Sequence, residues 1–446
     1  MKYLPEMDSI RTHTIPQWYN DCKFGIFIHW GIYSVPAWAY PSGQLGTIPF
    51  DERWFAYNPY AEWYCNTVRA GFGPAYEHHV KSYGADFDYE SFADMWKAEK
   101  WEPAKWADLF KKSGAQYVIP TSKHHDGFCL WNTKYSDYNS YLRGPKRDII
   151  KELGEAVRAA GIRYGVYYSG MLNWHITRNA MMSDYEVHHP NNITNAYADL
   201  AYNQMMEIVD NFQPSVLWND LDWPLKGLDD LPYLFAHYYN SVPEGVVNDR
   251  WHDVWHDYTT KEYHRGDKFL NQKWECCRGM GLSFGYNQVE TEQEHYLAHN
   301  DLIALLIDTV AFNGNLLINI GPKADGTIPP EQESRLLHLG KWLETNGEAI
   351  YSTRPFSTQK IEAENGAAIY FTQNDSAVYA IVVHPASGNS TIQLPHSALP
   401  NGKHQVLGSH NLHLSTGPDG TVIQLSDIPS DSVPIVIKFF KEDKGE

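Results

Sequence analysis

The sequence predicts an α/β protein in which a (β/α)8-like barrel is followed by a C-terminal antiparallel β-sandwich. Three observations lead to this prediction. The chain has 446 residues, which exceeds one ordinary core, whereas α/β barrels reach about 250 residues or more. Between residues 20 and 350, short apolar runs alternate with amphipathic helical stretches, and beyond about 355 only short alternating runs remain. We therefore expect a barrel domain over 1–352 and a sandwich over 353–446.

The barrel half reads as repeated strand–helix units. The first strand is expected at 24–29, a β-branched and aromatic run, and the residues of 196–212 place an apolar face at helical spacing. Further strands are expected at 117–121, 163–169, 215–218, 246–248, 269–274 and 315–320, with helices at 102–113, 146–160, 231–241, 293–312 and 330–346. Such alternation implies parallel strands covered by helices. The stretch 32–95 is too long for a strand–helix loop and reads as an insertion.

The C-terminal part alternates in short runs separated by turn clusters such as Gly-Pro-Asp-Gly. The alternating runs cover 367–373, 377–384, 390–395, 421–425 and 433–440. Period-two alternation without helical spacing is typical of strands with one buried face, as in a sandwich of about 90 residues.

Charge and composition exclude several classes of function. The net charge of −18, from 54 acidic and 36 basic residues, argues against nucleic acid as a partner. The N-terminus lacks the apolar stretch of a signal peptide, and no apolar run approaches the ~20 residues that span a bilayer. We therefore expect a cytoplasmic protein that does not bind membranes. Sixteen Trp and thirty Tyr are compatible with sugar binding, because aromatic planes pack on the C–H faces of sugar rings.

The expected strands end in polar residues that a strand does not need. These residues are His29, 123–126, 167–169, 218–220, 248–250 and 274–275. An Asp after a strand is often only a helix N-cap, and paired histidines are often structural. In a barrel, however, catalytic groups gather at the carboxyl ends of the strands, so the recurrence at successive ends favours an active site.

Metal and phosphate chemistry are poorly supported. His124 and His125 are adjacent and point in different directions, and the spacing of His252 and His256 suits a helical metal pair in a segment without a helix-start signal. The five cysteines include no Cys-x-x-Cys pair, and no phosphate-binding loop or Gly-x-Ser-x-Gly elbow occurs. We expect neither a metal nor a cofactor. Carboxylates among His, Trp, Tyr and Arg are instead typical of a glycosidase site.

Six motifs carry a family resemblance, and they run in order through roughly residues 15–350. They are Phe24–Gly31, Lys123–Phe128, Tyr167–Ser169, Leu217–Asp220, Asn248–Arg250 and Gly314–Pro322. These segments resemble the α-L-fucosidases of glycoside hydrolase family 29, and most closely the bacterial, broad-specificity branch. The resemblance implies hydrolysis of terminal α-L-fucose from fucosylated oligosaccharides or glycosides, with retention of configuration and a covalent fucosyl–enzyme intermediate.

The resemblance also implies roles for individual residues. Asp220, which closes the Trp-x-Asp motif, would be the nucleophile in preference to nearby Asp222. The acid/base would be Glu262, as in the bacterial enzymes, or Glu275, as in the animal enzymes, with Glu262 favoured and Glu62 a distant third. The implied substrate contacts are His29, Glu62, Trp63, His124, His125, Tyr167, Trp218 and Arg250, together with Phe284 facing the 6-methyl group.

Two other readings stay open at this level. One is another retaining glycosidase, such as a β-galactosidase-like enzyme, because fucose and galactose share a hydroxyl pattern. The other is a sugar-binding protein with an inactive site, which the presence of Asp220 disfavours. A homo-oligomer also stays open at this level.

Overall fold

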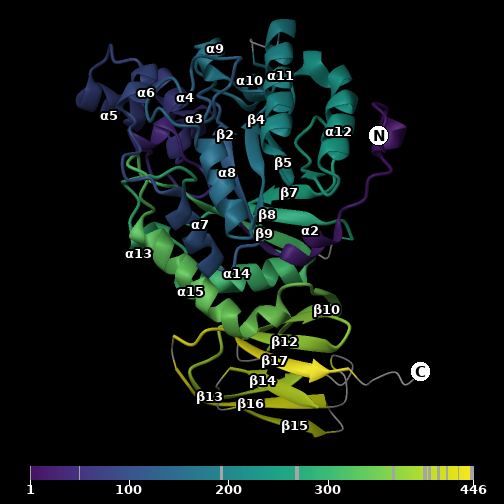
Figure 1. The fold of residues 1–446 in the computed structure, drawn as a ribbon. Helices are drawn as coiled ribbons and strands as arrows, with labels where there is room; N and C mark the ends of the chain where they lie inside the picture. Colours follow the sequence, from purple (N-terminus) through teal and green to yellow (C-terminus); the bar gives the residue numbers. More distant parts are fainter. Residues whose placement is uncertain are drawn as a thin grey trace.

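The computed structural model shows a parallel barrel stacked on an antiparallel sandwich (Figure 1). It describes residues 2–49, 51–190, 194–266, 271–363, 367–394, 399, 403–408, 412–417, 420–429 and 431–441. Helices α14 and α15 lie between the two parts, and the Trp342 indole of α15 donates a 2.9 Å hydrogen bond to the carbonyl of Pro434. The predicted fold class is confirmed.

One nine-stranded sheet forms the barrel, in the order β6-β5-β4-β2-β1-β9-β8-β7 with β3 paired to β2. Its strands are β1 Phe24–Ile28, β2 Tyr117–Lys123, β3 Arg163–Tyr164, β4 Val166–Ser169, β5 Val216–Asp220, β6 Val246–Val247, β7 Thr259–Glu262, β8 Trp274–Gly279 and β9 Gly314–Ile320. The ladders between them are parallel. Since β3 and β4 share one position beside β2, the sheet has eight strand positions.

Helices follow most of these strands and cover the outside of the sheet (Figure 1). They are α7 Pro103–Lys112, α8 Ile149–Ala159, α11 Asn195–Phe212, α12 Leu231–Ser241, α14 His299–Ala311 and α15 Pro330–Asn346. The N-caps are local: Asp148 accepts from the amide of Lys151, and Thr194 accepts from the amide of Tyr197. The helix expected at 293–312 is divided into the short α13 Glu292–His295 and α14.

The strand expected at 269–274 is wrongly placed. Residues 267–270 lie outside the described part of the chain, 271–273 are not strand, and β8 begins at Trp274. Every residue of β8 is buried, so the strand shows no alternation of apolar and polar residues. Its Glu and Arg also make the segment too polar to be recognised as a buried strand from the sequence. As a consequence Glu275 lies near the amino end of its strand, where barrels do not place catalytic groups.

The insertion after β1 folds into a group of short helices at the upper left of Figure 1. They are η1 Ile32–Ser34, α3 Glu52–Ala56, η2 Ala61–Trp63, α4 Tyr64–Arg69, α5 Pro74–Tyr83, η3 Tyr89–Ser91 and α6 Phe92–Met95. This insertion brings Glu62 and Trp63 to the cavity described below.

The sandwich consists of a five-stranded sheet, β10-β11-β12-β17-β14, and a three-stranded sheet, β13-β16-β15. The strands are β10 Arg354–Glu362, β11 Ala368–Gln373, β12 Ala377–Val383, β13 Gly388–Leu394, β14 His404–Leu407, β15 Leu412–Gly417, β16 Gly420–Ile428 and β17 Ile435–Phe440. Its core includes Phe371, Val382, Ile423 and Ile437. The first strand begins at Arg354, while the division of the chain at 352/353 stays a prediction.

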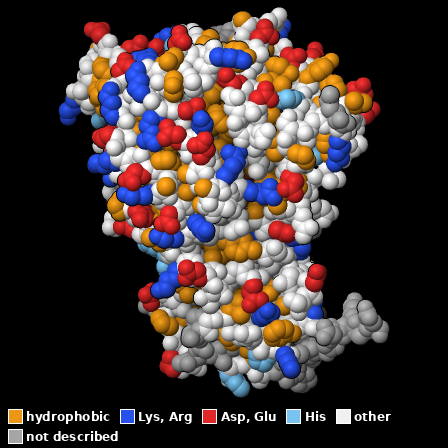
Figure 2. Space-filling model, viewed as in Figure 1, with side chains coloured by type: hydrophobic (Ala, Val, Ile, Leu, Met, Phe, Trp, Pro, Cys, Tyr) orange, Lys and Arg blue, Asp and Glu red, His pale blue; other side chains and the backbone are white. Residues whose placement is uncertain are grey.

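The surface carries mixed charges. Figure 2 shows Asp and Glu side chains interspersed with Lys and Arg over the visible face. Within the described ranges, no helix combines the length and apolarity that crossing a membrane requires.

Candidate active site

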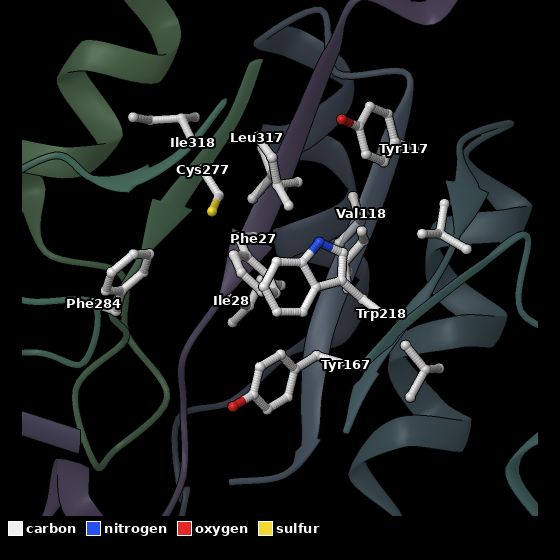
Figure 3. Close-up of a cluster of buried hydrophobic side chains, with 14 of the residues drawn as sticks. Phe27, Ile28, Tyr117, Val118, Tyr167, Trp218, Cys277, Phe284, Leu317 and Ile318 are labelled. Carbon is white, nitrogen blue, oxygen red and sulfur yellow. The ribbon is translucent and has the colours of Figure 1, made fainter. Parts of the chain in front are cut away.

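A cavity of about 180 Å³ lies at the carboxyl ends of the barrel strands. Eleven of the twelve predicted site residues line it, namely His29, Glu62, Trp63, His124, His125, Tyr167, Trp218, Asp220, Arg250, Glu262 and Phe284. Its apolar lining includes Phe27, Tyr167, Trp218 and Cys277, which come from separate strands, and Phe284 from the loop after β8, and Figure 3 shows these side chains in one buried cluster. The twelfth residue, Glu275, does not line the cavity.

Strand register brings the polar groups together. In the parallel ladder of β4 and β5, Tyr167 pairs with Trp218 and Ser169 pairs with Asp220. Glu262 is the last residue of β7, and Arg250 follows β6. Because these strands end at one rim, side chains far apart in sequence face one cavity.

Asp220 is buried and held as a carboxylate by three donors. The Tyr167 hydroxyl lies 2.7 Å from Oδ2, and Arg250 Nη1 lies 2.5 Å from Oδ1. Leu221 donates its amide to Oδ1 at 2.9 Å, from a turn in which Leu221 and Asp222 both have positive φ. Burial by itself would raise the pKa of Asp220, but the charge of Arg250 and the hydrogen bonds from Tyr167 and Arg250 outweigh it and hold the pKa below its usual value.

Glu262 contacts the same guanidinium, that of Arg250, but its pKa is shifted in the opposite direction. Arg250 Nη2 lies 3.5 Å from its Oε2, and the Tyr60 hydroxyl donates to its Oε1 at 2.9 Å. Burial raises the pKa of Glu262, and the nearby Asp220 charge adds to this, although Arg250 opposes both. Two carboxyls in one cavity with pKa values shifted apart are suited to different roles, one as a base or nucleophile and one as an acid.

These shifts predict a bell-shaped dependence of kcat/KM on pH. Activity should fall as pH drops through the lowered pKa of Asp220, which must be ionised, and as pH rises through the raised pKa of Glu262, which must be protonated. The alkaline limb should disappear in Glu262→Ala with an aryl fucoside whose leaving group needs no proton. If that limb persists in Glu262→Ala and disappears in Glu62→Gln, Glu62 is the acid, since burial raises the pKa of Glu62 to about 7.

His29, His124 and His125, the three cavity histidines at strand ends, are neutral. Burial lowers the pKa of His29 to about 4 and lowers the pKa of His124 and of His125 well below its usual value. His29 Nδ1 lies 2.7 Å from Asn319 Oδ1, and the Asn319 amide nitrogen donates to the Phe284 carbonyl. Asn319 Oδ1 is thus the acceptor, His29 carries its proton on Nδ1, and its Nε2 accepts hydrogen bonds.

Glu275 lies in the barrel interior, away from the cavity. Its Oε2 accepts from the hydroxyls of Tyr19 at 2.9 Å and Tyr117 at 2.7 Å, and its Oε1 accepts from the Trp218 indole at 2.9 Å. The carboxyl is fully buried with its oxygens occupied by protein donors. It therefore fixes the ring of Trp218 and has no route to a bound sugar.

Among the described residues, no three His, Cys, Asp or Glu side chains are grouped as metal ligands. The segment 251–257 forms turns and bends rather than a helix, and the His256 ring is hydrogen-bonded to the Gln272 side chain. His252 and His256 are therefore not a helical metal pair. The absence of a metal requirement remains a prediction. Prolonged dialysis against a chelator should leave kcat and KM for an aryl fucoside unchanged, whereas a loss that zinc or calcium restores would contradict the assignment of His124 and His125 to sugar hydroxyls.

The sequence did not identify several lining residues. These are Phe27, Leu45, Trp54, Tyr60, Asp184, Val187, His188, Leu221 and Cys277. Leu45, Trp54 and Tyr60 come from the insertion, and Asp184, Val187 and His188 from the short α10 Asp184–His188, where no strand end marks them. The only sequence signal for Tyr60 is its closeness to Glu62 and Trp63.

Comparison with known proteins gives one family. The sequence model of the alpha-L-fucosidase family matches residues 1–348. An alpha-L-fucosidase of Dictyostelium discoideum is 36% identical, covering 85% of this chain and 80% of that protein, and the tissue alpha-L-fucosidase of Homo sapiens is 34% identical, covering 97% and 90%. The structure of a Thermotoga maritima alpha-fucosidase in complex with fucose is 46% identical, with a TM-score of 0.88 over 98% of this chain and 100% of that one. The chain belongs to the alpha-L-fucosidase family.

Proposed function

We propose that this alpha-L-fucosidase releases terminal fucose by double displacement, with Asp220 as the nucleophile and Glu262 as the acid/base. One observation carries the proposal: a single guanidinium, that of Arg250, contacts both carboxyls in one cavity, while their pKa values move in opposite directions. A retaining glycosidase needs one ionised and one protonated carboxyl beside the scissile bond.

In the first step, the Asp220 carboxylate attacks C1 of the fucosyl residue while Glu262 gives its proton to the departing glycosidic oxygen. The bond between C1 and that oxygen breaks, and an ester between C1 and Asp220 forms. In the second step, Glu262 removes a proton from water, the water oxygen attacks C1, and Asp220 leaves as a carboxylate. Tyr167 and Arg250 stabilise Asp220 whenever it is ionised.

The remaining cavity groups suit the fucose ring. Neutral imidazoles can accept from and donate to sugar hydroxyls, and no described residue hydrogen-bonds the buried Nδ1 of His124. A buried polar atom without a protein partner in a cavity supports a hydroxyl of the ligand as its partner. The rings of Phe27 and Phe284 supply an apolar wall, which we assign to the 6-methyl group.

The placement of the two candidate acids supports Glu262 over Glu275. Glu262 lines the cavity and keeps 23% of its side chain exposed, so water can reach it in the second step. Glu275 is 0% exposed, and its carboxyl oxygens already accept hydrogen bonds from Tyr19, Tyr117 and Trp218.

The proposed activity is tested by release of nitrophenol from an aryl α-L-fucoside, compared with an aryl β-galactoside. We expect a strong preference for the fucoside, because a β-D-galactoside belongs to the opposite enantiomeric series and cannot match both the hydroxyl contacts and the apolar wall that suit L-fucose. A preference for the β-galactoside would contradict the proposal, and binding of fucose without release of nitrophenol would indicate a sugar-binding protein instead.

A further inference from the structure

The loop that carries Phe284 is held by a carboxyl group outside the cavity. This loop, residues 281–285, follows β8. Glu290 accepts the amide of Ser283 at 2.8 Å on Oε1 and the amide of Leu282 at 3.3 Å on Oε2. Glu290 does not line the cavity, and none of the roles above uses it.

Two further side chains bind the same loop, and one of them lines the cavity. Glu62 accepts the amide of Gly285 at 2.7 Å, and Asn319 donates to the carbonyl of Phe284 at 2.6 Å. Glu62 belongs to η2 and Asn319 to β9, so three carboxyl or carboxamide side chains from separate parts of the chain bind the backbone from Leu282 to Gly285. The hydroxyl of Tyr263, which follows β7, adds a hydrogen bond of 2.8 Å to the carbonyl of Leu282. Of the three carboxyl or carboxamide side chains, only Glu290 acts without also lining the cavity or bonding a residue implied in sugar binding.

The space for the Glu290 carboxyl depends on a glycine. A Cβ on Gly281 would lie 1.8 Å from Glu290 Oε2, far inside van der Waals contact. Any side chain at position 281 would therefore displace the carboxyl from the two amides that it binds. The loop is thus shaped around Glu290 at this point.

The loop position sets the position of an apolar ring. Phe284 is 6% exposed, and its ring centroid lies 4.9 Å from that of His29 and 5.5 Å from that of Tyr60. Since the ring is packed on these sides, a shift of the loop moves the wall of the cavity. A wall held close leaves no hydrogen-bond partner for a hydroxyl on C6, and burying an unpaired hydroxyl is costly.

We propose that Glu290 is a positioning residue that makes the enzyme specific for a 6-deoxy sugar, acting through the backbone amides of Leu282 and Ser283 on the ring of Phe284. The inference rests on the proposed function, in that it takes Phe284 to face C6 of the bound sugar. L-Fucose and L-galactose differ only by the hydroxyl on C6, so their relative affinities report on this wall.

The test measures the Kd of L-fucose and of L-galactose by calorimetry for the wild type, Glu290→Ala, Glu290→Gln and Gly281→Ala. We expect the preference for fucose, the ratio of the two Kd values, to fall about tenfold in Glu290→Ala and Gly281→Ala, the range for one group in an apolar pocket. The ratio should fall less in Glu290→Gln, because the carbonyl oxygen of the glutamine still accepts a hydrogen bond from one backbone amide. Glu294→Ala, an exposed glutamate four residues on, is the matched control and should keep the wild-type ratio.

A purely structural role predicts a different result. Both Kd values would then rise together, or the Tm would fall with the ratio unchanged, and either result in both Glu290→Ala and Gly281→Ala would overturn the inference. In a Phe284→Ala background, Glu290→Ala should have no further effect on the ratio, and an undiminished effect there would also overturn it. Because these are binding measurements, failure of the proposed function appears separately, as absence of nitrophenol release by the wild type.

Discussion

Replacing Asp220 by glycine is expected to lower kcat for an aryl α-L-fucoside by roughly 10⁴- to 10⁶-fold, the scale of loss when a catalytic nucleophile is removed. The substrate can still bind, but no carboxylate remains to form the ester with C1. Azide should restore part of the activity, because a small anion fills the space left by the carboxylate and attacks C1 directly. The product should be the β-fucosyl azide, which NMR identifies.

Asp222 provides the matched control for this experiment. It lies two residues further along, has a positive φ that glycine tolerates, and accepts the amide of His252 outside the cavity. Asp222→Gly should retain activity near that of the wild type. If Asp220→Gly is nearly normal and Asp222→Gly is inactive, the assignment of the nucleophile is wrong.

Replacing Glu262 by alanine is expected to slow the second step far more than the first when the leaving group is a good one. An aryl leaving group of low pKa hardly needs a proton, whereas water still needs a base. The fucosyl–enzyme should therefore accumulate, with a low KM and a kcat lowered by about 10²- to 10⁴-fold. Azide should rescue this variant by attacking the intermediate, and it should give the α-fucosyl azide, with retention.

Glu275→Gln tests the alternative acid with nearly the same shape. The amide nitrogen of the glutamine cannot accept hydrogen bonds, so at least one of the donors Tyr19, Tyr117 and Trp218 would lose its buried partner. The loss should lower the free energy of unfolding by about 1–3 kcal/mol. We expect a lower Tm, a modest loss of activity and no azide rescue. Formation of the α-azide by a Glu275 variant, but not by Glu262→Ala, would show that Glu275 is the acid.

The sequence predicts the barrel well where local signals agree with the fold. Strand β1 is an apolar run and strand β9 is mostly apolar apart from two asparagines, and every residue of both strands is buried. Helix α11 shows its buried face at helical spacing with Thr194 as its cap. The motifs at the ends of β2, β4 and β5 predict that His124, His125, Tyr167 and Asp220 lie together, and the structure brings them to one cavity.

The errors occur where burial and polarity conflict. Strand β8 carries a buried Glu275 and a buried Arg278. The cost of burying the Glu275 carboxyl is offset by hydrogen bonds from Tyr19, Tyr117 and Trp218, which come from distant segments that a sequence does not reveal, whereas Arg278 donates to the carbonyl of its neighbour Gly279. Strand β7 was not predicted because Thr259–Glu262 is polar and only half-buried. The contributions of α10 and of Glu290 depend on loop geometry, which no period or motif encodes.

The central claim is that Asp220 forms a covalent bond with the sugar, and trapping that ester tests it most directly. A 2-fluoro-fucosyl fluoride should react once per active site, because fluorine at C2 slows both steps while the good leaving group lets the first proceed. Proteolysis and mass spectrometry should then find a 2-fluorofucosyl group on Asp220. A label on Asp222, Glu262 or another carboxyl, or rapid turnover to the inverted sugar with no label, would contradict the account.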